Sequence, residues 1–191
     1  MFQAIENARH IVLIAHINPD ADSLGSASAM YTHLLRLEKK VTLFCVTERI
    51  NPNLAFLPWF DRIRHHFPAK ADLAISFDCG AYKRLGVEVA CPLVNVDHHK
   101  SNESYGDVNV IDISAISTTQ VLFDAFNREG ITINPKMARA TPKCTPKRMA
   151  LARAGSFFLK PRKSMQIDVV SEVMADWANL GVEGHFRAKR P

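Results

Sequence analysis

The sequence predicts an α/β protein in which a mostly parallel central sheet is flanked by helices. Short apolar runs, rich in β-branched residues, alternate with helical segments across residues 10–130, as in chains built from strand–helix–strand units. Such runs suit parallel strands, because both faces of a parallel sheet are buried. We expect strands at residues 11–15, 41–46, 72–77, 93–96 and 107–111, and helices at residues 2–8, 24–37 and 121–130.

The composition is that of a soluble globular chain, with 47% hydrophobic and 23% charged residues. The 191 residues are enough for one core with a small appendage. No apolar run approaches the roughly 18 residues of a membrane-spanning helix, and the first residues lack the pattern of a signal peptide. Four widely spaced cysteines without a C-x-x-C pair are typical of reduced thiols. We therefore expect a cytoplasmic protein that does not enter membranes.

The charge is distributed unevenly along the chain. Residues 1–135 contain 12 Lys and Arg against 15 Asp and Glu, a net charge of −3. Residues 136–191 contain 12 against 4, a net charge of +8. The change in composition indicates that the last third of the chain differs in origin or role from the rest.

Potential metal ligands follow the first predicted strand, in the stretch HINPDADSLGS. His16, Asp20 and Asp22 bring one imidazole and two carboxylates into a turn at the carboxyl end of a strand, where open α/β sheets bind their ligands. This donor set suits Mn²⁺, Zn²⁺ or Fe²⁺ rather than Ca²⁺. In an extended loop, Asp20 and Asp22 would point the same way and could serve two neighbouring metal ions. The alternative is that both aspartates only cap the following helix.

Two further strands also end on titratable residues. Asp78 follows the third predicted strand, and Asp97-His98-His99-Lys100 follows the fourth. Asp78 could also cap a helix beginning at Ala81. Parallel strands bring their carboxyl ends to one edge of the sheet. If all three groups of residues only capped helices, their presence at this one edge would be three independent coincidences. The sequence therefore favours a functional site at this edge.

Three stretches, HINPDADSLGS, SFDCG and NVDHHKSN, resemble in order and spacing the first three motifs of the DHH phosphoesterases. The segment Ser117–Thr119 makes the chain most similar to the bacterial bifunctional oligoribonuclease/pAp phosphatase (nanoRNase) group. The resemblance covers residues 1–138. It implies a DHH-type domain at residues 1–138, followed by a poorly specified C-terminal extension at residues 139–191.

Carried over position by position, the resemblance implies two metal sites that share one bridging ligand. His16, Asp20 and Asp78 would hold the first divalent ion. Asp22, Asp78 and His98 would hold the second, with Asp78 bridging. We expect both ions to be Mn²⁺.

The resemblance also implies a reaction, in which a hydroxide between the two metal ions attacks phosphorus. His99 would contact the scissile phosphate, and Asp97 would orient the neighbouring histidines. Ser26 and Lys100 would complete the substrate site. The expected substrates are short RNA or pAp-like nucleotides. The alternatives are a pyrophosphatase, a cyclic-dinucleotide phosphodiesterase, or an impaired remnant that only binds metal or nucleotide. The sequence leaves open whether the chain forms a homodimer.

The resemblance stops near residue 139. The family's fourth motif carries an aspartate, but here Arg153-Ala154 precedes Gly155–Phe157, and no acidic residue occurs between Glu129 and Asp168. We expect the family's C-terminal DHHA1-type domain to be lacking. Our hypothesis is that residues from about 139 onward derive from a shifted reading frame or a truncated gene. The alternative is a basic appendage that binds nucleic acid through its phosphates.

This hypothesis predicts a lesion in the gene near the codons for residues 135–145. Resequencing that interval checks it. A continuous frame, together with related proteins that share the same tail, would contradict the hypothesis.

Overall fold

The computed structural model describes residues 1–140. The remainder of the predicted basic extension, from residue 141 onward, lies outside the described residues. The described chain contains four α-helices: α1 (Phe2–Asn7), α2 (Ala21–Arg36), α3 (Thr118–Arg128) and α4 (Pro135–Ala140). It also contains six strands and three short 3₁₀ helices: β1 (His10–Ala15), β2 (Lys40–Phe44), β3 (Ile63–Arg64), β4 (Leu73–Phe77), β5 (Leu93–Asp97), β6 (Val108–Ile111), η1 (Pro52–Leu54), η2 (Phe60–Arg62) and η3 (Tyr82–Leu85).

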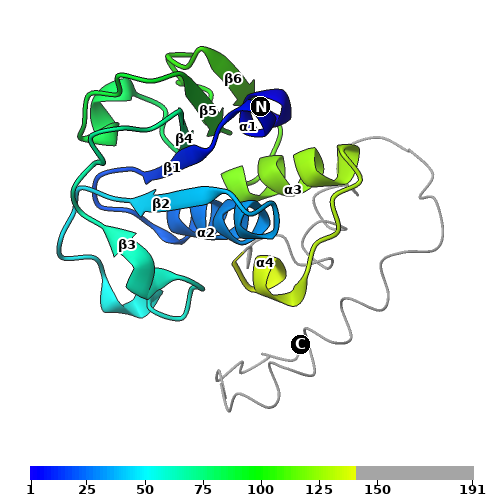
Figure 1. The fold of residues 1–191 in the computed structure, drawn as a ribbon, viewed down its shortest axis with the longest axis horizontal. Coiled ribbons are helices and arrows are strands. Elements are labelled where there is room, and N and C mark those ends of the chain that lie inside the picture. Colours follow the sequence, from blue (N-terminus) through cyan, green and yellow to red (C-terminus); the bar gives the residue numbers. More distant parts are fainter. Residues whose placement is uncertain (141–191) are drawn as a thin grey trace, which may run out of the picture. The chain divides into compact units, whose positions relative to one another are not determined.

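The six strands form one sheet in the order β3-β2-β1-β4-β5-β6 (Figure 1). Every neighbouring pair is parallel, which confirms the predicted fold class. The five predicted strands are all present, and the additional strand β3 has only two residues, too few to leave a pattern in the sequence. The chain first builds outward from β1 through β2 to β3 and then returns to place β4 on the other side of β1. This reversal lies between β1 and β4, the position where open α/β sheets bind ligands.

The two faces of the sheet are covered differently. Helix α2 lies against β1, β2 and β4, and α3 contacts both α2 and β5 (Figure 1). Because successive strand residues point to opposite faces, Ile11 and Leu13 join the core beneath the helices. Val12 and Ile14 join a second cluster with Leu85 of η3. Helices therefore cover one face, whereas the other is covered by η3 and loop residues.

Helix α2 begins three residues earlier than predicted. Asp20 is its N-cap, and the carboxylate accepts hydrogen bonds from the backbone N–H of Asp22 at 2.9 Å and of Ser23 at 3.0 Å. Asp22 thus lies in the first helical turn, and the expectation that Asp20 and Asp22 alternate in an extended loop is wrong. Capping is the physical reason, because a carboxylate satisfies amides that have no intrahelical partner.

Three cysteines of the described chain agree with the sequence analysis. Cys45, Cys79 and Cys91 are free thiols. None of the helices in residues 1–140 is both long and apolar enough to cross a membrane.

Replacing Leu13 by Ala should lower the free energy of unfolding by about 2–5 kcal/mol, because Leu13 is fully buried at the centre of the sheet. The matched control is Leu35→Ala in α2, where the side chain is 40% exposed and the same change should cost less than about 1 kcal/mol. Urea unfolding of both variants measures the difference. Equal losses would contradict the assignment of Leu13 to the core.

Candidate metal centre

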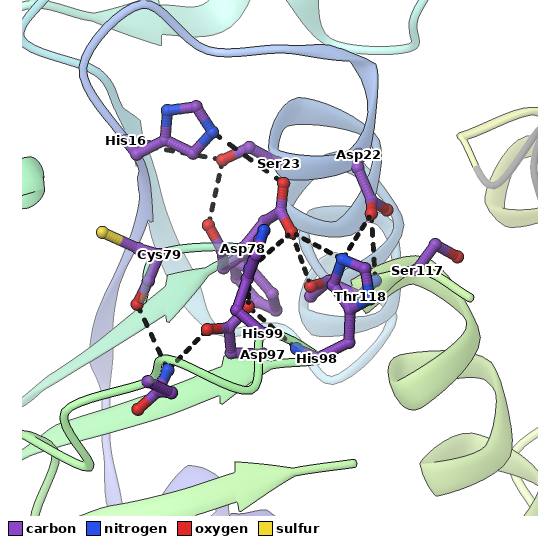
Figure 2. A network of polar contacts seen from close by, with 12 residues as sticks. His16, Asp22, Ser23, Asp78, Cys79, Asp97, His98, His99, Ser117 and Thr118 are labelled. Carbon is purple, nitrogen blue, oxygen red and sulfur yellow. Dashed lines mark hydrogen bonds and ion pairs between the residues drawn. The ribbon is translucent and has the colours of Figure 1, made fainter. Parts of the chain in front are cut away.

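The ends of three parallel strands meet the N-terminal ends of two helices at one edge of the sheet (Figure 2). His16 follows β1, Asp78 follows β4, and Asp97 ends β5, directly before His98 and His99. Helix α2 contributes Asp22, and helix α3 contributes Thr118. The structure thus brings together the three groups of titratable residues that the sequence analysis singled out.

Asp78 lies at the centre of this group and is only 3% exposed. Its Oδ2 is 3.8 Å from His16 Nε2, and its Oδ1 is 3.5 Å from His98 Nε2. Its backbone has φ +60°, a left-handed conformation that aspartate adopts more readily than most residues. The carboxylate therefore faces one histidine on each side (Figure 2).

The charge of Asp78 is stabilised despite its burial. Thr118 Oγ1 donates a hydrogen bond of 2.9 Å to Asp78 Oδ1. Burial alone would raise the pKa of this carboxyl, but the contacts with His16 and Thr118 and the nearby His99 and His98 outweigh burial and hold the pKa below its usual value. Asp78 is thus poised to bind a cation.

Two overlapping sets of side chains have ligand atoms within 4.8 Å of one another and could each hold a metal ion. One set is His16, Asp20 and Asp78, and the other is Asp78, His98 and His99. Imidazole nitrogen with carboxylate oxygen is a donor set that suits first-row divalent ions. The residues therefore fit the metal ions that the sequence predicts, with Asp78 common to both sets.

Asp22 is nearly completely buried, at 1% exposure, and ties α2 to α3. Its two oxygens accept hydrogen bonds of 3.0 Å from the backbone N–H groups of Thr118 and Thr119. An anion here is favoured by the helix dipole and by the unpaired amides of the first turn of α3. Its Oδ2 also lies 3.8 Å from His98 Nε2, so Asp22 is beside the second set of donors without belonging to it.

Asp97 is fully buried and orients both histidines that follow it. Its Oδ1 accepts a 2.8 Å hydrogen bond from the backbone N–H of His98 and contacts His99 Nδ1 at 2.7 Å. Burial alone would lower the pKa of His99, but the hydrogen bond and the charge of Asp97 outweigh burial and raise the pKa. The half-exposed His99 ring is held by Asp97 at the surface of the site.

Asn102 holds the other oxygen of Asp97 and was not singled out from the sequence. Its Nδ2 donates to Asp97 Oδ2 at 2.5 Å, and its Oδ1 accepts from Asn95 Nδ2 at 2.9 Å. Thr118 was likewise named only as part of the segment Ser117–Thr119, without a role in the site. Asn102 ends the stretch NVDHHKSN, but an amide close to a strand end is too common to indicate a role by itself.

Two of the three residues predicted to contact substrate, Ser26 and Lys100, lie in different environments. Ser26 is completely buried in α2, and its hydroxyl has no hydrogen-bond partner within the described part of the chain. Lys100 is exposed and directly follows His99.

Comparison with known proteins identifies the family. The family model "DHH family, N-terminal domain" matches residues 10–146, and the chain therefore belongs to the DHH family. The bifunctional oligoribonuclease and PAP phosphatase NrnA of Thermus thermophilus is 29% identical over 139 residues, which cover 71% of this chain and 41% of that protein. The resemblance inferred from the three motifs is thus confirmed.

A solved structure shows the same fold. It is an exopolyphosphatase-related protein from Bacteroides fragilis, with a TM-score of 0.66 and 18% identity, covering 95% of this chain and 56% of that chain. The chain spans about two fifths of the length of the first curated relatives that it matches. A kynureninase from Flavobacterium johnsoniae is 42% identical over only 50 residues, 26% of this chain and 11% of that enzyme, which is too little to show a family.

Replacing Thr118 by Val should weaken Mn²⁺ binding by about 10- to 100-fold, the usual effect of removing a hydrogen bond to a metal ligand. Valine keeps the branched shape of threonine and the backbone N–H that donates a hydrogen bond to Asp22. It lacks the hydroxyl that donates a hydrogen bond to Asp78. Calorimetric titration with Mn²⁺ measures the change, and circular dichroism checks that the helices remain. Thr118→Ser, which restores a hydroxyl, is the control. Unchanged affinity in Thr118→Val would contradict a supporting role for this hydroxyl.

Proposed function

We propose that the protein is a metal-dependent phosphoesterase that hydrolyses short oligoribonucleotides or pAp-like nucleotides. The observation that carries the proposal is the buried Asp78 carboxylate, which is shared by two histidine-containing sets of potential ligands. A carboxylate shared in this way could serve two neighbouring metal ions, as a two-metal mechanism would use them. The similarity to an oligoribonuclease and PAP phosphatase supports the substrate class.

In this proposal, His16, Asp20 and Asp78 hold one ion, and Asp78, Asp22 and His98 hold the other. Asp22 remains a candidate because its Oδ2 is 3.8 Å from His98 Nε2. When bound, two divalent ions, most simply Mn²⁺, would supply Lewis-acid charge and an activated water for attack on phosphorus.

The protein's own residues bind and orient the substrate. His99 lies at the surface of the site, where an imidazole N–H can donate to a phosphoryl oxygen. Asp97 keeps the His99 ring in position through the 2.7 Å contact with Nδ1, which leaves Nε2 for the substrate. Lys100, exposed beside His99, adds positive charge that attracts phosphate.

A second candidate function is binding of metal or nucleotide without turnover. It is favoured by one observation, the lack of any acidic residue between Glu129 and Asp168, where the fourth family motif would supply a carboxylate. The two candidates differ in turnover and agree in metal binding.

The test is hydrolysis of pAp and of a 5′-phosphorylated RNA dinucleotide by the full chain, with Mn²⁺ and after chelation. We expect turnover only with metal. Asp78→Asn should reduce turnover by more than about 100-fold, beyond the loss typical of a residue that only supports a ligand. The matched control is Asp61→Asn, at a surface carboxylate beside Arg62, which should leave turnover unchanged.

Other outcomes separate the alternatives. A strong preference for pyrophosphate or for a cyclic dinucleotide would replace the proposed substrate class. Nucleotide binding without metal-dependent turnover would favour the second candidate. Equal activity of Asp78→Asn and wild type would overturn the proposed site.

A further inference from the structure

Arg84 is a cation beside the metal-ligand set that neither the sequence motifs nor the proposed mechanism uses. It lies in η3, on the loop that follows β4, and its side chain is exposed. Its guanidinium Nη2 lies 3.0 Å from His16 Nδ1. An exposed arginine next to a metal-binding imidazole requires an explanation, because two groups that are both cationic when protonated repel one another.

The backbone around Arg84 is held firmly against the loop that carries His16. The N–H of Ile17 donates a 2.9 Å hydrogen bond to the carbonyl oxygen of Arg84. Gly86 ends η3 with φ +69°, and a Cβ added there would lie 2.5 Å from Val46 Cγ1 and 3.0 Å from Ile17 Cγ1. This close packing fixes the position of Arg84 relative to His16.

The contact between Arg84 and His16 depends on which ring nitrogen carries the proton. His16 Nδ1 is also 2.8 Å from the carbonyl oxygen of Ile17. One nitrogen cannot donate to that carbonyl and accept from the guanidinium at the same time. When Nε2 serves as a metal ligand, the ring proton is on Nδ1 and Ile17 O accepts it, so that Arg84 no longer has an acceptor at His16.

Arg84 has no carboxylate partner in the described part of the chain. None of the ion pairs found among residues 1–140 includes Arg84. The guanidinium is exposed, forms no ion pair within residues 1–140, and extends from a backbone held beside His16. Its planar fork can donate two hydrogen bonds to two oxygens of a phosphate group.

We propose that Arg84 is a substrate-binding residue whose guanidinium binds a phosphate oxygen of the substrate when the metal site is loaded. The inference rests on the proposed function, because it requires metal at His16 and a phosphate-containing substrate. It adds a binding contact on the His16 side of the site, opposite the side where His98 and His99 face Asp78.

The experiment is a calorimetric titration of inorganic phosphate into the full chain loaded with Mn²⁺, preceded by a titration of Mn²⁺ alone. Arg84→Gln should weaken phosphate binding about 10- to 100-fold, as expected for loss of a charge-assisted pair. Arg84→Lys should recover only part of the loss, because an ammonium lacks the planar fork. The matched control is Lys83→Gln, which removes the same charge from the neighbouring exposed residue of η3 and should bind phosphate like wild type.

Each outcome has a distinct meaning. Wild-type Mn²⁺ affinity in Arg84→Gln, with weakened phosphate binding, supports the inference. Equal phosphate affinity of Arg84→Gln and Lys83→Gln overturns the inference and leaves the proposed function intact. Loss of Mn²⁺ binding in Arg84→Gln would instead make Arg84 a support for His16 and would also overturn the inference. A wild-type chain that binds no Mn²⁺ overturns the proposed function and the inference together.

Discussion

The structure depends on keeping three carboxylates charged where a parallel sheet buries them. Asp22, Asp78 and Asp97 are at most 3% exposed, and an unpaired buried charge is costly. Each of them pairs with a histidine, and hydrogen bonds from backbone amides, Thr118 and Asn102 support these pairs. The cluster thus combines carboxylate oxygens with imidazole nitrogens, a donor set that suits first-row divalent cations.

The topology explains why these residues meet. All strands run in the same direction, so their carboxyl ends share one edge, and the reversal between β1 and β4 opens that edge for side chains. The N-terminal ends of α2 and α3 then add amide donors at the same edge. The phosphate chemistry proposed here thus follows from strand direction and helix polarity.

Sequence patterns predicted the sheet and the clustering of His16, Asp78 and His98, because apolar runs ending on polar residues are strong local signals. They did not reveal the start of α2. The loop was expected to be extended through Asp22, but Asp20 caps the helix and Asp22 lies in its first turn. They also did not reveal the role of Asn102, although it ends the stretch NVDHHKSN, because its hydrogen bonds to Asp97 and Asn95 form only when the loop after β5 folds back. Such side-chain contacts leave no periodic trace in the chain.

Asp22 has a dual attachment that affects what substitutions can reveal. Its carboxylate holds the first amides of α3 and also lies beside His98. Removing it would disturb helix docking and metal coordination together, so that lost activity and lost stability could not be separated at this position. Within residues 1–140, the hydrogen-bond and ion-pair partners of His99 are Asp97 and Asp78, and neither lies in a helix. The chemistry of the site can therefore change through His99 while the docking of α2 and α3 stays intact.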